Sequence, residues 1–466
     1  MDTIRLFRHH IHAKLLLLGL IELGLVVAAV YASAYVRFGY DAVDQAYLHH
    51  LFWRAMLVGA LVVFSMQAMG LYHRHLRANG FQLLVRIALS FASAAVVLAV
   101  LFYIAPSLYL GRGIMGLATI AAFGLIVLTH GFVYAGLGKG ATRKRVLIYG
   151  AGRNAANILA RMRRRSDWIS FRLLGCIPAP SEPINIEQAR LLAPEDSLAA
   201  FAARQGADEI IVAMDERRAA FPVDDLLDCR LNGIAVTDML TFYERSAGKI
   251  KTDLLRPSWI IFSDGFSQSW RWRWCKRALD VAAAALLLFI TWPIMLLAAL
   301  LIKCENGWRA PVHYRQVRVG QYGREYTILK FRSMSVDAES GKACWASKND
   351  ARVTRVGRYL RKYRIDELPQ LINVIRGDMS FVGPRPERPE FVNELAQELA
   401  FYDIRHRVKP GITGWAQLSY PYGSSQDDAL EKLQYDLYYV KNGSLFLDLV
   451  IILGTVEVVL FRKGAR

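Results

Sequence analysis

Two adjacent carboxylates, Asp366 and Glu367, lie in the last third of the chain, where arginine and lysine otherwise prevail. Phosphoryl transfer needs a nucleophile, neutralisation of phosphate charge and a stabilised leaving group. One carboxylate can act as the nucleophile through an acyl phosphate, and its neighbour can hold Mg²⁺. Consecutive helical residues point about 100° apart, so the pair does not suit glycosidase chemistry on one atom. The spacing favours one nucleophile and one metal ligand. The alternative is two solvated acids at a helix start, where they complement the helix dipole.

Short blocks rich in basic residues, glycine and proline surround this pair. Arginine offers a planar fork of donors that matches phosphate oxygens, so the excess of basic residues suits a substrate with several phosphates. We expect Lys330 and Arg332 to bind such phosphates. The blocks cover residues 326–334, 352–357, 358–361, 365–373, 377–386 and 409–414.

The elements that must position these residues include membrane segments. Hydrophobic residues make up 54% of the 466 residues, and the net charge is +18, a composition that favours a membrane protein over a soluble one. Four stretches fit helices of about twenty apolar residues that span a bilayer. These stretches are residues 15–36, 51–71, 81–104 and 114–137. No small-residue cleavage site is evident after the first stretch, so we expect it to be retained as a span.

Basic residues fix the expected orientation of these spans. They precede the first stretch, separate the second from the third and follow the fourth, so the positive-inside rule places the N-terminus and the chain after residue 137 in the cytoplasm. Glu22 and Arg86 fall inside spans, where a helix–helix contact is favoured over a lined pathway. The flanking basic residues are Arg5, Arg8, Lys14, Arg74, Arg77, Lys139, Arg143, Lys144 and Arg145.

A fifth apolar segment, residues 278–302, contains Pro293 near its middle and has basic residues on both sides. Both flanks therefore prefer the cytoplasm. A re-entrant helix over residues 275–303, broken at Pro293, satisfies this preference, and Thr291 is placed to bond the carbonyl that the proline frees. A straight span is the alternative, and it would put the most motif-rich part of the chain outside the cytoplasm.

Between these membrane segments the pattern predicts an α/β domain over residues 141–250. A strand at residues 146–149 leads into Gly150-Ala-Gly152-Arg-Asn-Ala155, a GxGxxA turn of the dinucleotide-binding type. Further strands are expected at 171–177 and 208–213. The second strand ends in Pro178-Ala-Pro180, where a ribose-binding acid would be expected. This favours a structural or regulatory Rossmann-like domain, although nucleotide binding at Gly150 and Gly152 stays open.

Two further segments bear on the membrane. Residues 251–274 are expected to form a linker that closes in an alternating tryptophan and basic run, residues 270–277, which we interpret as interfacial anchors rather than a stacking surface for nucleic acid. The apolar run at residues 445–461 contains Asp448 and Glu457, so a helix at the bilayer surface is favoured over a sixth span.

The cysteines give no sign of a disulfide framework or a zinc site. They are odd in number and show no metal-ligand spacing. They are Cys176, Cys229, Cys275, Cys304 and Cys344.

Several motifs in order resemble the polyprenyl-phosphate sugar-1-phosphate transferases, which are monotopic phosphoglycosyl transferases. The motifs are Lys330-Phe-Arg-Ser-Met334, Asp366-Glu-Leu-Pro-Gln-Leu-Ile-Asn373, Gly383-Pro-Arg-Pro386, Pro410-Gly-Ile-Thr-Gly-Trp415 and the proline-broken apolar segment. The resemblance covers residues 270–466. The preceding spans and Rossmann-like domain resemble the long form, as in undecaprenyl-phosphate glucose and galactose phosphotransferases. The whole arrangement is also similar to exopolysaccharide sugar transferases associated with exosortases.

The resemblance implies roles for individual residues. Asp366 is expected to be the nucleophile that takes the phosphosugar and releases UMP, Glu367 to bind Mg²⁺, and Arg385 to hold phosphate. Arg361 is expected to orient the nucleophile, and Pro293 to form the break of the re-entrant helix. Family members usually carry serine before that proline, where this chain has Thr291-Trp292.

The resemblance also implies an activity and a place in the cell. Sugar 1-phosphate, with glucose or galactose expected first, would pass from a UDP-sugar to undecaprenyl phosphate to begin exopolysaccharide, capsule or O-antigen synthesis. The enzyme would be a homodimer in the bacterial inner membrane with its catalytic domain on the cytoplasmic face, and it would have no nucleic-acid partner.

The expected fold is a four-span membrane α-helical bundle over residues 1–140, a cytoplasmic α/β Rossmann-like domain, and a membrane-associated α-rich catalytic domain over residues 275–466 with a re-entrant helix. Two rival functions stay open. A membrane-anchored nucleotide-sugar dehydratase or epimerase needs a Tyr-x-x-x-Lys pair on a helix, and that spacing occurs at Tyr326 and Lys330 in a strand-like stretch. A non-enzymatic membrane scaffold or sensor would leave the Asp366-Glu367 cluster without a purpose.

Overall fold

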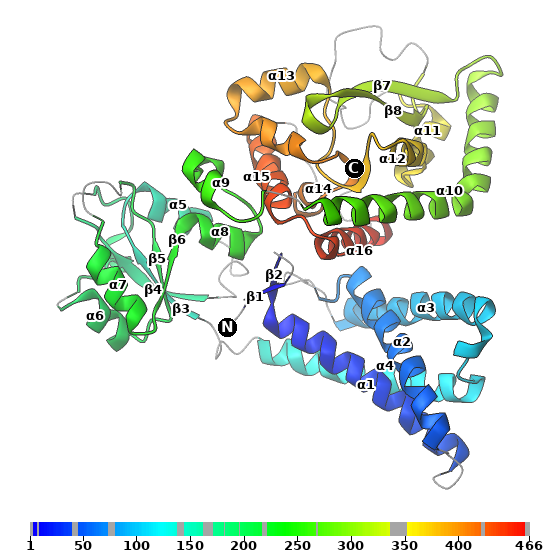
Figure 1. The fold of residues 1–466 in the computed structure, drawn as a ribbon, viewed down its shortest axis with the longest axis horizontal. Coiled ribbons are helices and arrows are strands. Elements are labelled where there is room, and N and C mark those ends of the chain that lie inside the picture. The colour runs from blue at the N-terminus through cyan, green and yellow to red at the C-terminus, as the bar shows by residue number, and fades with distance from the viewer. Residues whose placement is uncertain are drawn as a thin grey trace. The chain divides into compact units, whose positions relative to one another are not determined.

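A computed structural model describes residues 3–6, 9–39, 45–72, 80–137, 144–161, 171–180, 182–194, 196–216, 221–266, 269–335, 352–420 and 425–461 (Figure 1). The chain divides into two compact units, with the boundary between Gly248 and Lys249. Several residues used above lie outside the described ranges, namely Arg8, Arg74, Arg77, Lys139, Arg143 and Cys344.

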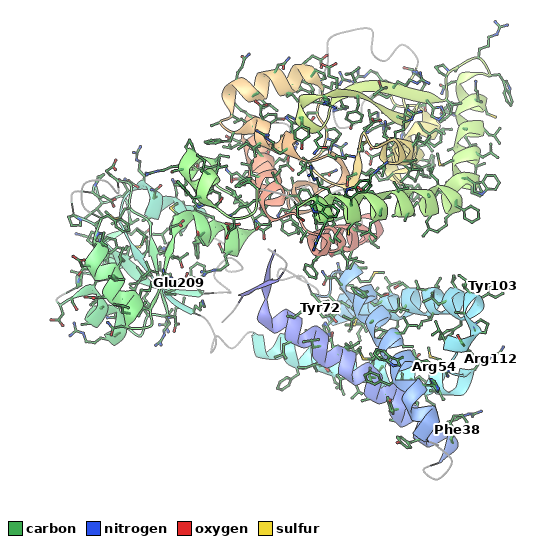
Figure 2. All side chains as sticks on the ribbon, viewed as in Figure 1. Phe38, Arg54, Tyr72, Tyr103, Arg112 and Glu209 are labelled. Carbon is green, nitrogen blue, oxygen red and sulfur yellow. The ribbon has the colours of Figure 1, made fainter. Side chains whose placement is uncertain are left out.

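Four long helices coincide with the four predicted apolar stretches. They are α1 (Ala13–Phe38), α2 (Gln45–Ala68), α3 (Gly80–Ile104) and α4 (Arg112–Leu137), preceded by strands β1 (Thr3–Leu6) and β2 (His9–His12) and interrupted by η1 (Pro106–Leu108). Each contains a segment that is long and apolar enough to cross a membrane. Large side chains such as Phe38 and Tyr103 extend outward from these helices (Figure 2). With α10 below, five such helices occur in the described part of the chain, and we describe it as a membrane protein.

Glu22 forms a helix–helix contact, as the sequence favoured. Its carboxylate lies on α1 and is fully buried, with Oε1 2.7 Å from Nδ1 of His130 on α4. The hydroxyl of Tyr72 donates to the other carboxylate oxygen. Buried polar groups in an apolar bundle need such partners, so the cluster ties α1 to α4.

The α/β domain contains the three predicted strands and a fourth that the pattern missed. Strands β3 (Lys144–Tyr149), β4 (Phe171–Ile177), β5 (Glu209–Val212) and β6 (Ala235–Asp238) form a parallel sheet in the order β4-β3-β5-β6. Its other elements are α5 (Arg153–Arg161), η2 (Gln188–Arg190), α6 (Leu198–Arg204), α7 (Val223–Leu231) and α8 (Met239–Ala247). Strand β6 is only partly buried, so it lacks the continuous apolar run that revealed the others.

Much of the expected linker at 251–274 is helical. It contains η3 (Thr252–Leu254) and α9 (Pro257–Phe262). The Lys249 ammonium lies 2.7 Å from the Glu431 carboxylate, and the Ile250 amide donates to the Gln434 carbonyl. The chain from Lys249 onward is therefore attached to the second unit.

Helix α10 (Trp270–Asn306) carries the fifth apolar segment and begins five residues earlier than expected, because the Ser269 side chain accepts a hydrogen bond from the Trp272 amide. Figure 1 shows the helix turning sharply along its length, and Pro293 lies within it. The Thr291 hydroxyl donates to the Leu287 carbonyl at 2.7 Å. The prediction that Thr291 serves the carbonyl freed by Pro293, that of Phe289, is therefore wrong: a threonine in a helix bonds its own i−4 carbonyl, a contact that itself favours bending.

The basic end of the tryptophan run makes internal contacts. Lys276 pairs with Asp448 at 2.7 Å, and the Arg277 guanidinium donates to the carbonyls of Val374 and Ile375, in the last turn of α12 (Gln370–Arg376). Trp270 and Trp274 are exposed. The anchor interpretation thus fits these two tryptophans, whereas Lys276 and Arg277 hold α10 to the rest of the second unit.

The remainder of the second unit is a small, mainly helical domain. Its strands are β7 (His313–Val319) and β8 (Glu325–Phe331), paired antiparallel, and β9 (Ser380–Val382) and β10 (Gly411–Thr413), paired parallel. Its helices are η4 (Gln321–Gly323), α11 (Arg355–Lys362), η5 (Ile365–Glu367), α12 (Gln370–Arg376), α13 (Pro389–Glu398), η6 (Tyr402–Arg407), α14 (Trp415–Ser419), α15 (Gln426–Asn442) and α16 (Leu445–Phe461).

Two apolar cores attach this domain to the two arms of α10. Before Pro293, Ala284 packs with Ile328 and Leu371. After it, Ala298 and Ile302 pack with Phe331 and Leu360. Helix α16 packs on α14, β9 and β10, so its apolar residues serve this domain in part.

Candidate active site

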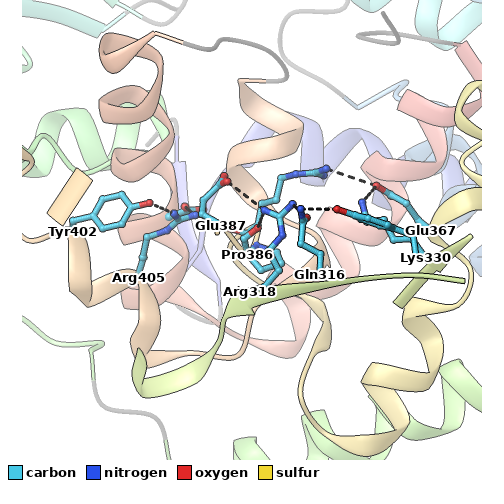
Figure 3. Close-up of polar contacts among 11 residues, drawn as sticks. Gln316, Arg318, Lys330, Glu367, Pro386, Glu387, Tyr402 and Arg405 are labelled. Atoms are coloured by element: carbon cyan, nitrogen blue, oxygen red, sulfur yellow. Dashed lines mark hydrogen bonds and ion pairs between the residues drawn. The ribbon is translucent and has the colours of Figure 1, made fainter. Parts of the chain in front are cut away.

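The site forms where the end of β8, the turn after α11 and the loop after β9 meet. Lys330 lies near the end of β8, opposite Tyr314 in the β7–β8 pair. Asp366 and Glu367 lie in η5, and Arg385 follows β9. Figure 3 shows Lys330 and Glu367 facing each other, with a row of polar contacts extending from them to Tyr402.

The carboxylate pair lies on a tight turn rather than within an α-helix. Helix α11 starts at a Thr354 cap and ends at Lys362. Arg364 then adopts a left-handed conformation with φ 58° and ψ 20°. Such a backbone costs a non-glycine residue on the order of 1–3 kcal/mol and is typical of functional sites. The turn brings the side chains of Asp366 and Glu367 close to the same cluster of basic residues, although the two residues are adjacent in the sequence.

Glu367 is surrounded by three cations. Its Oε1 lies 3.4 Å from Lys330 Nζ, 3.5 Å from an Arg364 guanidinium nitrogen and 3.7 Å from one of Arg385. Burial alone would raise the pKa of Glu367, but Lys330, Arg385 and Arg364 outweigh it and hold that pKa below the ordinary range. Glu367 is therefore ionised at neutral pH.

The pKa of Asp366 is shifted in the opposite direction. Burial raises its pKa, the neighbouring charge of Glu367 raises it further, and Lys330, Arg364 and Arg361 only partly oppose this. Its Oδ1 is buried without a hydrogen-bond partner among the described residues. An unsatisfied buried acceptor calls for an explanation, and beside a cluster of cations a bound ligand is one explanation.

The loop that carries Arg385 is fixed by its backbone. The Gly383 amide donates to the Thr413 carbonyl and the Gly411 amide to the Pro384 carbonyl, each at 2.9 Å. A Cβ on Gly383 would meet the Lys409 carbonyl at 2.2 Å, so only glycine permits this approach. The Gly383–Pro386 motif is thus a rigid support that presents Arg385.

Two further arginines hold the same loop. Arg405 donates to the Arg385 carbonyl at 2.9 Å, and Arg318 donates to the Pro386 carbonyl at 3.0 Å (Figure 3). Arg405 is buried and pairs with Asp436 on α15 at 2.8 Å. Arg318 lies 3.7 Å from Glu387. These two guanidiniums, of which that of Arg405 is buried, position Arg385 without themselves reaching Glu367.

The structure brings together Asp366, Glu367, Lys330 and Arg385 of the residues predicted for the site. Arg361 donates to the Ser333 hydroxyl at 2.9 Å and acts on Asp366 through its charge. The Arg332 guanidinium instead donates to the Pro311 carbonyl at 3.1 Å.

The remaining predicted residues lie elsewhere in the chain. Pro293 lies in α10, and Gly150 and Gly152 lie in the α/β domain.

Sequence reasoning missed Arg318, Arg364 and Arg405 as parts of this site, and it weighed Tyr326 only for a rival function. Arg364 stands two residues before Asp366, so its position offered a signal. The other two arginines carry none, since their partners are distant in the sequence. Burial raises the pKa of Tyr326, and its hydroxyl is buried without a hydrogen-bond partner in the described part of the chain. Tyr326 and Lys330 lie on strand β8, not on the helix that a dehydratase or epimerase pair requires.

The donor set fits Mg²⁺ in the manner of phosphoryl-transfer sites. Within the described ranges, no three His, Cys, Asp or Glu side chains form a ready-made metal cage. Mg²⁺ is commonly held by one or two carboxylates together with substrate phosphates. Glu367, ionised, and the unsatisfied Oδ1 of Asp366 offer that set.

Comparison with known proteins places this fold and site in a class. Residues 271–462 match the family model described as bacterial sugar transferase, and residues 67–225 match one described as a CoA-binding domain. The chain is similar to an uncharacterized sugar transferase, EpsL, of Bacillus subtilis, with 41% identity over 41% of this chain and 90% of that protein.

Two relatives carry functional names. One is a UDP-glucose:undecaprenyl-phosphate glucose-1-phosphate transferase of Caulobacter vibrioides, 43% identical over 41% of this chain and 71% of the relative. The other is a UDP-N-acetylgalactosamine-undecaprenyl-phosphate N-acetylgalactosaminephosphotransferase of Aeromonas hydrophila, 42% identical over 52% of this chain. The match spans about half of the latter's length, 56%. The chain belongs to the bacterial sugar transferase family.

Proposed function

We propose that this protein transfers a sugar 1-phosphate from a UDP-sugar to undecaprenyl phosphate and releases UMP. The observation that carries the proposal is the unsatisfied Oδ1 of Asp366 beside Glu367, within a cluster of Lys330, Arg364 and Arg385. A nucleophile next to fixed positive charge is what attack on a diphosphate requires.

The reaction proceeds in two balanced steps. An Asp366 carboxylate oxygen attacks the phosphorus that bears the sugar, the bond from that phosphorus to the bridging oxygen breaks, and UMP leaves with the electron pair. An oxygen of undecaprenyl phosphate then attacks the acyl phosphate, which restores the carboxylate and gives undecaprenyl diphosphate sugar. The course is ping-pong, because UMP leaves before undecaprenyl phosphate reacts with the phosphosugar held on Asp366.

The basic residues neutralise the diphosphate during both steps. Arg385 is more accessible than Lys330, with 45% of its side chain exposed against 20%, and its guanidinium fork suits phosphate oxygens, so we assign it the first contact with phosphate. Mg²⁺, when held by Glu367, would supply further charge neutralisation to the phosphate oxygens. Arg361 supports Asp366 through its charge.

The sugar donor is proposed from the relatives. Their names include glucose and N-acetylgalactosamine, and UDP-glucose and UDP-galactose remain our first candidates, followed by UDP-N-acetylgalactosamine. A role in starting exopolysaccharide, capsule or O-antigen synthesis follows from such a product. The homodimer stays a prediction.

We further propose a re-entrant path for α10, in the inner membrane with the catalytic domain on the cytoplasmic face. Leu286, Phe289 and Trp292 before or at the bend and Leu296 and Leu300 after it are exposed apolar or aromatic residues. Both arms also pack against one polar domain through Ala284 and Ala298. A straight span would place that domain on both sides of the bilayer, whereas a bent helix keeps both ends on one side.

The test is UMP release by purified full-length protein with Mg²⁺ and a panel of UDP-sugars, with and without undecaprenyl phosphate. We expect UMP from one or two sugars, none from Asp366→Asn, and none in excess EDTA. Arg358→Lys, at an exposed position on α11, is the matched control and should retain activity. Release of UDP, or undiminished UMP release by Asp366→Asn, would overturn the proposal.

A further inference from the structure

The GxGxxA turn of the α/β domain lies at the point where a doubly wound sheet binds ligands. The order β4-β3-β5-β6 reverses direction between β3 and β5, and ligands of such sheets bind outside the carboxyl ends of the strands at that reversal. Helix α5 begins there, directly after β3 and Gly152. In a dinucleotide-binding domain the first amides of this helix would bind a pyrophosphate.

Those amides are occupied in this chain by a side chain of the domain itself. Both carboxylate oxygens of Asp215, which follows β5, accept backbone hydrogen bonds: Oδ2 from the Arg153 amide and Oδ1 from the Asn154 amide, each at 2.8 Å. Asp215 is largely buried, with 16% of its side chain exposed. Its carboxylate therefore stands where the phosphate would bind and carries the same sign of charge.

The loops on both sides secure this arrangement. The Asp215 amide donates to Glu182 Oε1 at 2.6 Å, and the Asn154 side-chain amide donates to the Met214 carbonyl at 3.1 Å. The Asn185 amide bonds the Ala151 carbonyl at 2.9 Å, so the chain after β4 also crosses the turn. A second carboxylate, Glu182, thus lies at the same end of the sheet.

The two glycines of the motif leave room for Asp215 and for the chain after β5. A Cβ on Gly152 would meet Asp215 Oδ2 at 2.4 Å, and a Cβ on Gly150, at φ 120°, would meet the Ala213 backbone at 2.8 Å. The small residues that elsewhere admit a pyrophosphate here admit Asp215 and the chain that follows β5. Close packing within the domain therefore explains the two glycines without a bound nucleotide.

We infer that Asp215 is an internal substitute for a phosphate ligand, and that this domain does not bind CoA or another phosphate-bearing nucleotide at its glycine-rich turn. The CoA that the family description implies does not fit these residues. To bind there, a phosphate would have to displace a carboxylate from two amides and lie near Glu182. The negative charge of the phosphate would be repelled by both carboxylates.

The test uses full-length protein in detergent and hydrogen–deuterium exchange of peptides covering residues 146–158 and 207–216. CoA, NAD⁺ and inorganic pyrophosphate are each added at about 1 mM. We expect exchange in both peptides to stay unchanged in the wild-type protein. Protection of these peptides by any of the three probes would overturn the inference.

A second experiment tests the role of the Asp215 carboxylate directly. Asp215→Ala frees two amides that a charged acceptor held, so exchange at residues 150–158 should rise about tenfold or more. Asp208→Ala is the matched control, because Asp208 stands at the opposite end of β5 and accepts the Arg145 amide at 2.6 Å. It should raise exchange near residue 145 and leave 150–158 unchanged. Equal exchange at 150–158 in Asp215→Ala and the wild-type protein would contradict the assignment.

Discussion

Arg405 donates a hydrogen bond to the backbone carbonyl of Arg385 at 2.9 Å, so a buried guanidinium fixes the loop whose own guanidinium faces Glu367. Arg405 is held in turn by Asp436 at 2.8 Å and by the Tyr402 hydroxyl at 2.6 Å. Geometry at a phosphate-binding arginine depends on such support, because a displacement of about 1 Å can cost a hundredfold in rate.

Arg405→Lys tests this support. Lysine keeps the charge opposite Asp436 but lacks the fork that also reaches the Arg385 carbonyl. We expect the KM for the UDP-sugar to rise about tenfold, with a smaller change in kcat. Combined with Arg385→Ala, it should add little further loss, since both act through one side chain.

Kinetics of the two single variants and the double variant, with melting temperatures, provide the measurement. Arg407→Lys is the control, because Arg407 is exposed on the same short helix. Fully additive losses in the double variant would show that Arg405 does not act through Arg385.

Sequence reasoning found what local patterns encode. The apolar runs predicted β3 and β4, and the motif blocks predicted that Lys330, Glu367 and Arg385 converge. The roles of Arg405 and Arg318 were not predicted, because their partners, Asp436 and the loop carbonyls, come close only in the folded chain. The bond from the Arg332 guanidinium to the Pro311 carbonyl is likewise set by the folded chain, and phosphate binding by Arg332 stays a prediction.

Asp366→Asn should make the protein more stable at neutral pH while abolishing activity. The folded-state pKa of Asp366 is raised, so the wild-type protein binds this proton more tightly when folded, and its stability falls as pH rises from the unfolded pKa through the folded one. Asparagine does not ionise, so the variant does not lose this stability as the pH rises. A gain on the order of 1 kcal/mol, about 2–4 °C in Tm, is expected.

Thermal unfolding of both proteins between pH 4 and pH 8 checks this. The Tm difference should be largest at pH 8 and shrink toward pH 4, where Asp366 is protonated. Glu367→Gln is a useful contrast, because the depressed pKa of Glu367 stabilises the fold at neutral pH and its loss should lower the Tm. A lower Tm for Asp366→Asn at pH 8 would contradict the burial argument.

Gly357→Ala should destabilise the catalytic domain. A Cβ at this position of α11 would meet the Ser333 carbonyl oxygen at 2.0 Å, and the same segment provides the Ser333 hydroxyl that Arg361 bonds. Displacement of α11 is expected to cost about 1–3 kcal/mol and to reduce activity. Thermal unfolding and UMP release measure the two effects. Gly124→Ala in α4 is the control, since a Cβ there meets nothing within 4 Å, and equal unfolding temperatures for the two variants would refute the close approach.

Two native cysteines allow the path of α10 to be tested. Cys275 and Cys304 lie near opposite ends of the helix, and both are free and exposed, whereas Cys176 and Cys229 are buried. In a Cys344→Ser background, a membrane-impermeant maleimide should label both thiols in inverted inner-membrane vesicles and neither in spheroplasts. Single Cys275→Ser and Cys304→Ser variants assign each signal. A straight span would expose one thiol to each side of the membrane. Labelling of Cys275 and Cys304 from opposite sides would therefore rule out the re-entrant path. The domain that packs on Ala284 and Ala298 would then have to contact only one arm of the helix.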